Sequence, residues 1–138
     1  MTDPGTTYVE LYATSHFSFL RGASSPEELF AAAASQGHSA LGLCDRGSVA
    51  GMVRGLSGQE ATGVRLIAGT RVDLRDGRSI LLYPTDRAAW SRLTRLLSLG
   101  KGRGGKVNCW LDWPDVAAAA EGLVAILLPG EADERARL

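Results

Sequence analysis

Five segments of the chain have the apolar content of β-strands, either alternating with polar residues or as a continuous run: Tyr8–Ala13, Ala40–Cys44, Leu66–Leu74, Ser79–Tyr83 and Leu123–Leu128. The alternation in Tyr8–Ala13 is typical of a strand with one buried face. The continuous runs Ala40–Cys44 and Leu123–Leu128 predict buried strands. Asp76-Gly77 separates the third segment from the fourth and predicts a hairpin turn between them, whereas Asp45–Gly47 predicts a turn after the second strand.

Capping residues and glycine stops predict four helices between these strands: Ser25–Gln36 before Gly37, Ser48–Thr62 before Gly63, Thr85–Gly100, and Asp112–Ala120 before Gly122. The first begins with a capping box, because Ser25 precedes Pro26 and is followed three residues later by Glu28. The second contains several glycines, each costing about 1 kcal/mol relative to alanine. The third has a clear apolar face formed by Trp90, Leu93, Leu96 and Leu97.

The order of these elements predicts an α/β fold around a largely parallel sheet or barrel. We expect a flexible N-terminus at residues 1–7, one partial domain over residues 8–138, and the first turns of a helix at Glu131–Leu138. The hydrophobic content is 45% and the formal net charge is zero, so any basic surface is local. We read neither a secretion signal nor a membrane span and expect a cytoplasmic protein, in which Cys44 and Cys109 are reduced thiols rather than a disulfide.

The glycine-rich sequence Gly100–Lys106 comes close to two nucleotide-binding patterns, GxGxxG and the P-loop. Both patterns require a preceding strand, whereas a helix is predicted here, and Val107 stands where a P-loop needs Ser or Thr. We therefore interpret this segment as a flexible, solvated connector. Its basic side chains remain candidates for weak contact with nucleic-acid phosphates: Lys101, Arg103 and Lys106.

Other chemically interesting residues have simpler structural explanations. His16 follows the first strand, where enzymes place functional loops, but packing beside Phe17 is the favoured interpretation. His38 is expected at the surface. Asp45 ends the second strand and is either a catalytic-type carboxylate or a turn residue beside Arg46. The tryptophans are interpreted as packing residues rather than platforms for bases: Trp90 in the core, and Trp110 and Trp113 elsewhere.

Several stretches carry a family resemblance in the same order: LYATSHFSFLRGASSPEEL at Leu11–Leu29, ALGLCDRGSVAG at Ala40–Gly51, and GVRLIAGTRVDL at Gly63–Leu74. They resemble the opening of the polymerase-and-histidinol-phosphatase (PHP) domain of the bacterial DNA polymerase III alpha-subunit family. The stretch LLYPTDRAAWSRLTRLLSLGKGRGGK at Leu81–Lys106 is more similar to the error-prone members than to the replicative ones. The resemblance covers about Tyr8–Pro129.

The resemblance implies a distorted seven-stranded β/α barrel, of which this chain supplies the first half or so. It implies a non-catalytic segment that braces the polymerase core and offers a docking surface. The full-length protein would act by nucleotidyl transfer in DNA replication, DNA repair, damage-induced mutagenesis and translesion synthesis. Its expected partners are the rest of the polymerase chain, other mutagenesis or replisome proteins, and DNA through the full-length protein, with no membrane.

The resemblance also places five positions where intact PHP domains hold divalent metals with His and carboxylate ligands: Tyr12, Thr14, Asp45, Arg46 and Arg71. Only Asp45 keeps a ligand type, and the two arginines add positive charge. No cofactor is therefore expected, with zinc, manganese or magnesium only if the degenerate site still binds. Whether Asp45 pairs with Arg46 or Arg71, or the arginines are solvated, stays open.

Two alternative functions also remain: a metal-dependent phosphoesterase of the PHP superfamily, and a stand-alone interaction module from a truncated gene. The sequence leaves open whether Leu138 is a native end or a truncation, which oligomeric state forms, and which proteins are the specific partners. Because a half barrel leaves strand edges unpaired, we expect the isolated chain to be marginally stable, or to dimerise or aggregate.

Overall fold

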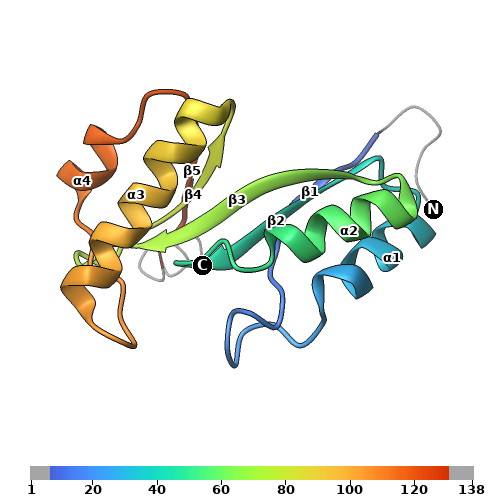
Figure 1. The fold of residues 1–138 in the computed structure, drawn as a ribbon, viewed down its shortest axis with the longest axis horizontal. Helices are drawn as coiled ribbons and strands as arrows, with labels where there is room; N and C mark the ends of the chain where they lie inside the picture. The colour runs from blue at the N-terminus through green and yellow to red at the C-terminus, as the bar shows by residue number, and fades with distance from the viewer. Residues whose placement is uncertain (1–6, 131–138) are drawn as a thin grey trace, which may run out of the picture. The chain divides into compact units, whose positions relative to one another are not determined.

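The computed structural model describes residues 7–130 (Figure 1). The predicted helix start at Glu131–Leu138 and the predicted flexible N-terminus, apart from Thr7, lie outside these residues. The described elements are β1 (Glu10–Ala13), α1 (Pro26–Ser35), β2 (Ala40–Arg46), α2 (Met52–Thr62), β3 (Arg65–Asp73), β4 (Ser79–Pro84), α3 (Arg87–Gly104), α4 (Trp113–Ala118) and β5 (Leu123–Leu128). Strands are hydrogen-bonded in the order β1-β2-β3-β4-β5, and the predicted α/β class is confirmed. The chain forms two compact units, divided after Ala68.

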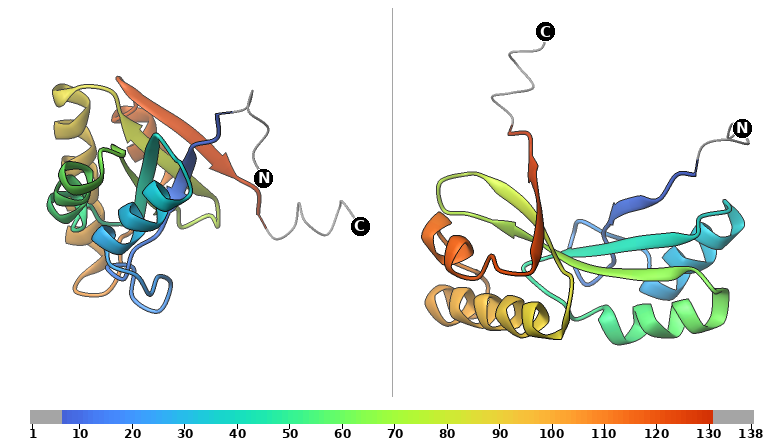
Figure 2. Two further views of the ribbon diagram at one scale, coloured as in Figure 1. Left: turned by 90° about the vertical axis from the view of Figure 1, so that its right-hand side faces the viewer. Right: turned by 90° about the horizontal axis from the view of Figure 1, so that it is seen from above.

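In the first unit, β1 and β2 pair in parallel, and helices α1 and α2 pack side by side (Figures 1 and 2). The predicted capping box of α1 is confirmed. The Ser25 hydroxyl accepts from the Glu28 amide at 3.2 Å, and the Glu28 carboxylate accepts from the Ser25 amide at 2.7 Å. The core of this unit joins α1 to β2 and to the segment after α2 through Phe30, Ala33, Leu41 and Val64.

Two predicted boundaries in this unit are wrong. The helix predicted from Ser48 begins only at Met52, because the Ser48 hydroxyl accepts from the Ala50 amide in a local turn before the helix. Asp45 and Arg46 are the last residues of β2 rather than the start of a turn. The glycines that seemed to weaken α2 have a packing role instead, since a Cβ on Gly58 would lie 2.8 Å from the ring of Phe30.

In the second unit, β3, β4 and β5 form an antiparallel arrangement with α3 packed against β4 (Figure 2). The predicted Asp76-Gly77 turn is confirmed, with Gly77 at φ 92°. The largely parallel sheet predicted from the sequence is wrong here. Two successive helices return the chain to the end of β4 that it left, so Leu123 of β5 lies opposite Pro84 of β4.

The boundaries of α3 also differ from the prediction. Asp86 caps the helix by accepting from the Ala89 amide at 2.7 Å, whereas the hydroxyl of the predicted cap, Thr85, donates to the Gly122 carbonyl. The helix runs past Gly100 to Gly104, so the predicted flexible basic loop is mostly a helical turn. Gly100 serves packing rather than termination, because a Cβ there would lie 2.6 Å from the Cys109 sulfur.

Burial follows the prediction for most of the α3 face, where Leu93, Leu96 and Leu97 are buried. Trp90, predicted in the core, is only half-buried. The prediction that β5 is buried is wrong, because it pairs with β4 alone in the described part of the chain and exposes Val124 and Leu127. The two cysteines form no disulfide, as predicted.

Candidate functional site

The carboxyl ends of β1 and β2 bring four of the five ligand-position residues into one region. Parallel strands end at the same edge, so Tyr12 and Thr14, at the end of β1 and just after it, lie near Asp45 and Arg46 at the end of β2. The Thr14 hydroxyl donates to the Cys44 carbonyl at 3.5 Å. These are four of the positions at which the resemblance to PHP domains implies metal ligands.

Asp45 is fully buried and acts as a hydrogen-bond acceptor for the loop that follows β1. Its Oδ1 accepts from the Ser15 amide at 2.8 Å and from the Ser18 hydroxyl at 2.7 Å, and its Oδ2 accepts from the Ser15 hydroxyl at 2.8 Å. Ser18 Oγ in turn accepts from the Arg46 amide at 2.9 Å. Asp45 is therefore neither an exposed turn residue nor a carboxylate open to solvent, and it anchors the loop.

The anchored loop, residues 14–24, is tightly folded. The Ser18 amide donates to the Ser15 carbonyl at 3.0 Å, and the Gly22 amide donates to the Ser18 carbonyl at 3.1 Å. A Cβ on Gly22 would lie 2.2 Å from the Ser15 carbonyl oxygen, so only glycine fits there. The sequence did not single out Ser15 or Ser18, since they lie 30 and 27 residues from Asp45.

The fifth position, Arg71, lies on β3 in the second unit. Its Nε donates to Asp73 at 2.8 Å, and its guanidinium also donates to the Ser79 hydroxyl at 3.1 Å. Ser79 donates to Asp73 at 2.6 Å, which closes a triangle across the β3–β4 hairpin. The spacing of Arg71 and Asp73 on one face of a strand is the signal that could have predicted this pair. The pairing of Asp45 with Arg46 or Arg71 stays a prediction.

These residues do not fit a PHP-type metal cluster. Tyr12, Thr14 and the two arginines offer neither an imidazole nor a carboxylate, and Asp45 already accepts from two serine side chains. In the part of the chain that the structure describes, no group of three or more His, Cys, Asp or Glu residues is placed to hold a metal ion.

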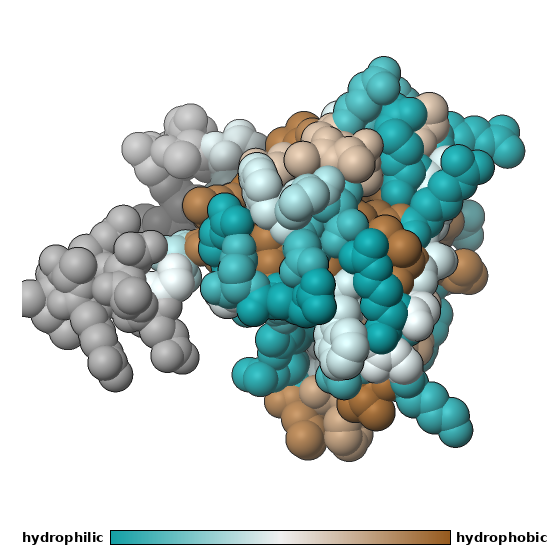
Figure 3. Space-filling view, turned by 90° about the vertical axis from the view of Figure 1, so that its left-hand side faces the viewer, coloured by the Kyte–Doolittle hydropathy of each residue, from teal (hydrophilic) through white to brown (hydrophobic). Residues whose placement is uncertain are grey.

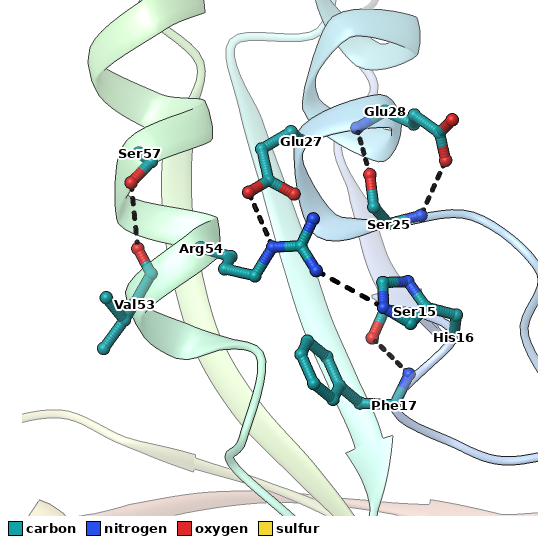
Figure 4. A network of polar contacts seen from close by, with 9 residues as sticks. All are labelled: Ser15, His16, Phe17, Ser25, Glu27, Glu28, Val53, Arg54 and Ser57. Carbon is teal, nitrogen blue, oxygen red and sulfur yellow. Dashed lines mark hydrogen bonds and ion pairs between the residues drawn. The ribbon is translucent and has the colours of Figure 1, made fainter.

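A second polar cluster joins the loop to α1 and α2 (Figure 4). His16 stacks on Phe17 with ring centroids 4.7 Å apart, which confirms the predicted packing. Arg54 donates to Glu27 at 2.7 Å, and its NH1 nitrogen lies 3.4 Å from His16 Nε2. The hydrogen bond from Arg54 lowers the pKa of Glu27. The sequence did not predict the part played by Arg54, which is 38 residues from His16.

The other histidine is less exposed than predicted. His38 is half-buried and makes an edge-on contact with Tyr8, with ring centroids 5.4 Å apart. The Tyr8 hydroxyl donates to Glu10 at 2.6 Å, which lowers the pKa of Glu10 and raises that of Tyr8. The backbone amide of Tyr12 also donates to Glu10, at 2.9 Å, so this cluster involves β1 itself.

The basic residues proposed to contact nucleic acid lie at the end of α3 and just after it. Arg103 forms an ion pair with Asp115 at 2.7 Å, whereas the side chains of Lys101 and Lys106 are exposed. Their contact with phosphate stays a prediction. On the face drawn in Figure 3, long hydrophilic side chains separate smaller hydrophobic patches.

Trp110 and Trp113 are more exposed than packing residues would be, at 44% and 47%. The Arg78 guanidinium lies over the Trp113 ring at 5.0 Å from its centroid.

Among the described helices, none is long and apolar enough to span a bilayer.

The chain matches a known domain family and is similar in sequence to bacterial error-prone DNA polymerases. The family model described as PHP domain matches residues 10–134. The chain is 65% identical over 127 residues to error-prone DNA polymerase 2 of Rhizobium meliloti (strain 1021) and 59% identical over 128 residues to error-prone DNA polymerase 3 of Agrobacterium fabrum. These matches cover 92% and 93% of the chain but only 12% of each relative.

Solved structures share the fold. A putative metal-dependent phosphoesterase from Bifidobacterium adolescentis superposes with a TM-score of 0.59 at 18% identity, covering 70% of this chain and 34% of that one. An amidohydrolase from Chromobacterium violaceum, solved with bound sulfate and no metal, gives a TM-score of 0.57 at 25% identity, covering 69% and 34%. The part of this chain that superposes therefore corresponds to about a third of each structure, which is consistent with a partial barrel.

Proposed function

The chain belongs to the PHP domain family, and we propose that it is the non-catalytic PHP segment of an error-prone DNA polymerase, acting as a brace and docking surface for the polymerase core. In this proposal, nucleotidyl transfer and the roles in DNA repair, DNA replication and damage-induced mutagenesis belong to the rest of a longer, cytoplasmic polymerase. The similarity to error-prone polymerases over nearly the whole chain supports this assignment.

The main support for the proposal is the buried, hydrogen-bonded environment of the Asp45 carboxylate. Of the five metal-ligand positions, Asp45 alone keeps a ligand type, and its carboxylate is buried and hydrogen-bonded to Ser15 and Ser18. Hydrolysis by a PHP-type site requires a held ion that activates water. A carboxylate used to fold a loop, beside side chains that offer neither an imidazole nor a second carboxylate, supports a structural role and argues against the metal-dependent phosphoesterase alternative.

An activity assay tests the non-catalytic part of the proposal. The purified chain, supplied with manganese or zinc, should hydrolyse a phosphodiester such as bis(p-nitrophenyl) phosphate no faster than the metal alone, and should not extend primed DNA. Turnover that disappears in Asp45→Asn, which preserves side-chain volume, would assign a phosphoesterase instead.

A chimera tests the brace. The chain replaces the matching segment of the Rhizobium meliloti polymerase and is compared with the same enzyme lacking that segment. We expect the chimera to melt at a higher temperature and to extend DNA faster than the deleted form. Equal stability and activity of the two proteins would rule out a bracing role.

A further inference from the structure

The loop anchored on Asp45 presents an exposed apolar tip, Phe19–Arg21. Phe19 is 84% exposed and Leu20 is 86% exposed, and Arg21 beside them is also exposed. Within residues 7–130, Leu20 is the one non-glycine residue with a positive φ, at 61°. The Phe19–Arg21 tip thus combines strained backbone with two large apolar side chains in solvent.

The base of the same loop is rigid. Asp45 holds it through Ser15 and Ser18, and Gly22 packs directly against the Ser15 carbonyl. These contacts, together with the Arg21 amide donating to the Ser18 carbonyl at 2.9 Å, restrain the Phe19–Arg21 tip before any partner binds. Such preorganisation lowers the ordering cost of association.

Folding of this chain gives no reason for these side chains. A left-handed backbone favours glycine, and a branched side chain there is strained. Leu20 recovers little packing in return, because almost all of it is exposed. Strained residues with no internal benefit gather at functional contacts. The strain at Leu20 therefore points to a contact made with another surface.

We propose that the Phe19–Arg21 tip docks this chain on the polymerase part of the longer protein. Phe19 and Leu20 would insert into an apolar pocket, and Arg21 would pair with a carboxylate at its rim. This inference rests on the proposed function and identifies the docking element. Aromatic and arginine side chains dominate the energetics of protein contacts, and the relatives have far more chain outside this segment, which spans 12% of their length.

The charges around the tip favour a protein surface over phosphates. Arg21 is the one cation of the tip itself. Arg54, over the Phe17 ring, is paired with Glu27 at 2.7 Å, and Arg46, whose amide donates to Ser18, is half-buried. Binding to nucleic acid or to anionic lipid gains strength from several clustered cations. An exposed arginine that forms no ion pair within residues 7–130, beside two large apolar side chains, suits an apolar pocket with one acidic group.

Two substitutions at the tip test this in the chimera. Phe19→Ser removes the aromatic ring, and Leu20→Gly removes the side chain while relieving the strained backbone. The matched control is Val107→Ser, in the second unit, where a valine is 91% exposed. The readouts are the melting temperature of the chimera, hydrogen exchange of residues 14–24, and the melting temperature of the isolated chain.

We expect residues 14–24 to exchange at least about tenfold more slowly in the chimera than in the isolated chain. Both tip variants should abolish this protection and lower the melting temperature of the chimera, whereas Val107→Ser should change neither. Leu20→Gly should leave the isolated chain as stable as before or more stable, which a purely structural role for Leu20 would not allow.

Two results would overturn the inference. If both tip variants retain the protection and the melting temperature of the unmodified chimera, the tip is not the docking element, while the brace itself stands. If instead the isolated chain binds vesicles of phosphatidylcholine and phosphatidylglycerol, and Phe19→Ser abolishes this binding but does not affect the chimera, the tip is a membrane contact. Failure of the brace is detected separately, by the enzyme that lacks the whole segment.

Discussion

Replacing Asp45 with alanine should strongly destabilise the first unit, because buried hydrogen bonds depend on this carboxylate. The substitution removes the acceptor for the Ser15 amide, the Ser15 hydroxyl and the Ser18 hydroxyl, all of which are buried. A buried donor left without a partner costs about 1–3 kcal/mol. In Asp45→Ala both serine hydroxyls can rotate, and the cost of desolvating the Asp45 carboxylate is removed together with the carboxylate. The summed cost of the three unpaired donors therefore falls near the lower end of its range, at about 3 kcal/mol.

Urea unfolding followed by far-UV circular dichroism measures this loss. Circular dichroism is needed because the tryptophans, at positions 90, 110 and 113, all lie in the second unit. A loss of about 3 kcal/mol is a large part of the stability of an ordinary domain. Asp76→Ala is the matched control. Asp76 is exposed and, among residues 7–130, its side chain pairs with Arg78 of the same hairpin turn, so its loss should have a much smaller effect.

A double-mutant cycle with Ser15→Ala identifies the cause. In the native chain, Ser15→Ala should cost about 1–2 kcal/mol, because it removes a hydrogen bond to a buried carboxylate. In the Asp45→Ala background the same change should cost clearly less, since the carboxylate acceptor is already gone and only the contact from the Phe17 amide to the Ser15 hydroxyl, at 3.2 Å, is still lost. An equal cost of Ser15→Ala in both backgrounds would refute the view that Asp45 stabilises the loop through Ser15.

Three further predictions concern other parts of the chain. Gly58→Ala should lower the melting temperature of the chain, because the added Cβ would collide with buried Phe30. Gly102→Ala in α3, with open space around it, should instead stabilise the chain by up to about 1 kcal/mol. The reverse order of melting temperatures would contradict the packing described. Tyr8→Phe should raise the pKa of Glu10 toward its ordinary value in an NMR titration. A carboxyl whose pKa is lowered in the folded state stabilises the fold at pH values above its ordinary pKa, and this stabilisation is lost as the pH falls through the lowered pKa. Tyr8→Phe should therefore also weaken the dependence of the free energy of unfolding on acidic pH. An unchanged Glu10 pKa in Tyr8→Phe would contradict the role of the Tyr8 hydrogen bond. Leu127→Lys on the exposed strand β5 should reduce self-association of the isolated chain, measured by light scattering. If the native chain is already a monodisperse monomer that melts well above about 65 °C, the exposed strand edge does not cause self-association.

Local sequence signals predicted the parts of the fold that depend on neighbouring residues. The capping box at Ser25, the Asp76-Gly77 turn and the helix stop at Gly63 all follow from interactions within a few residues. The extent of α3 could not be predicted in this way. Gly100 looks like a stop in sequence, but it is required by the approach of Cys109 and Leu111, which only the tertiary structure reveals.

In the candidate site, too, the sequence predicted what depends on residue identity and missed what depends on tertiary contacts. The resemblance to PHP domains pointed to Asp45 and to the loss of ligands at Tyr12 and Thr14, since these depend on residue identity alone. The use of Asp45 as a loop anchor depends on serines 27 and 30 residues away, and no local pattern marks them. The exposure of β5 was missed because a continuous apolar run is the same in a central strand and in an edge strand.

Metal binding is the most direct test of the central claim that this PHP segment has lost its metal centre. The purified chain is equilibrated with zinc or manganese, dialysed, and analysed for metal per chain by inductively coupled plasma mass spectrometry, beside Asp45→Asn. The account predicts substoichiometric metal that is the same in both proteins. A stoichiometric amount of zinc or manganese in the native chain, absent from Asp45→Asn, would contradict it.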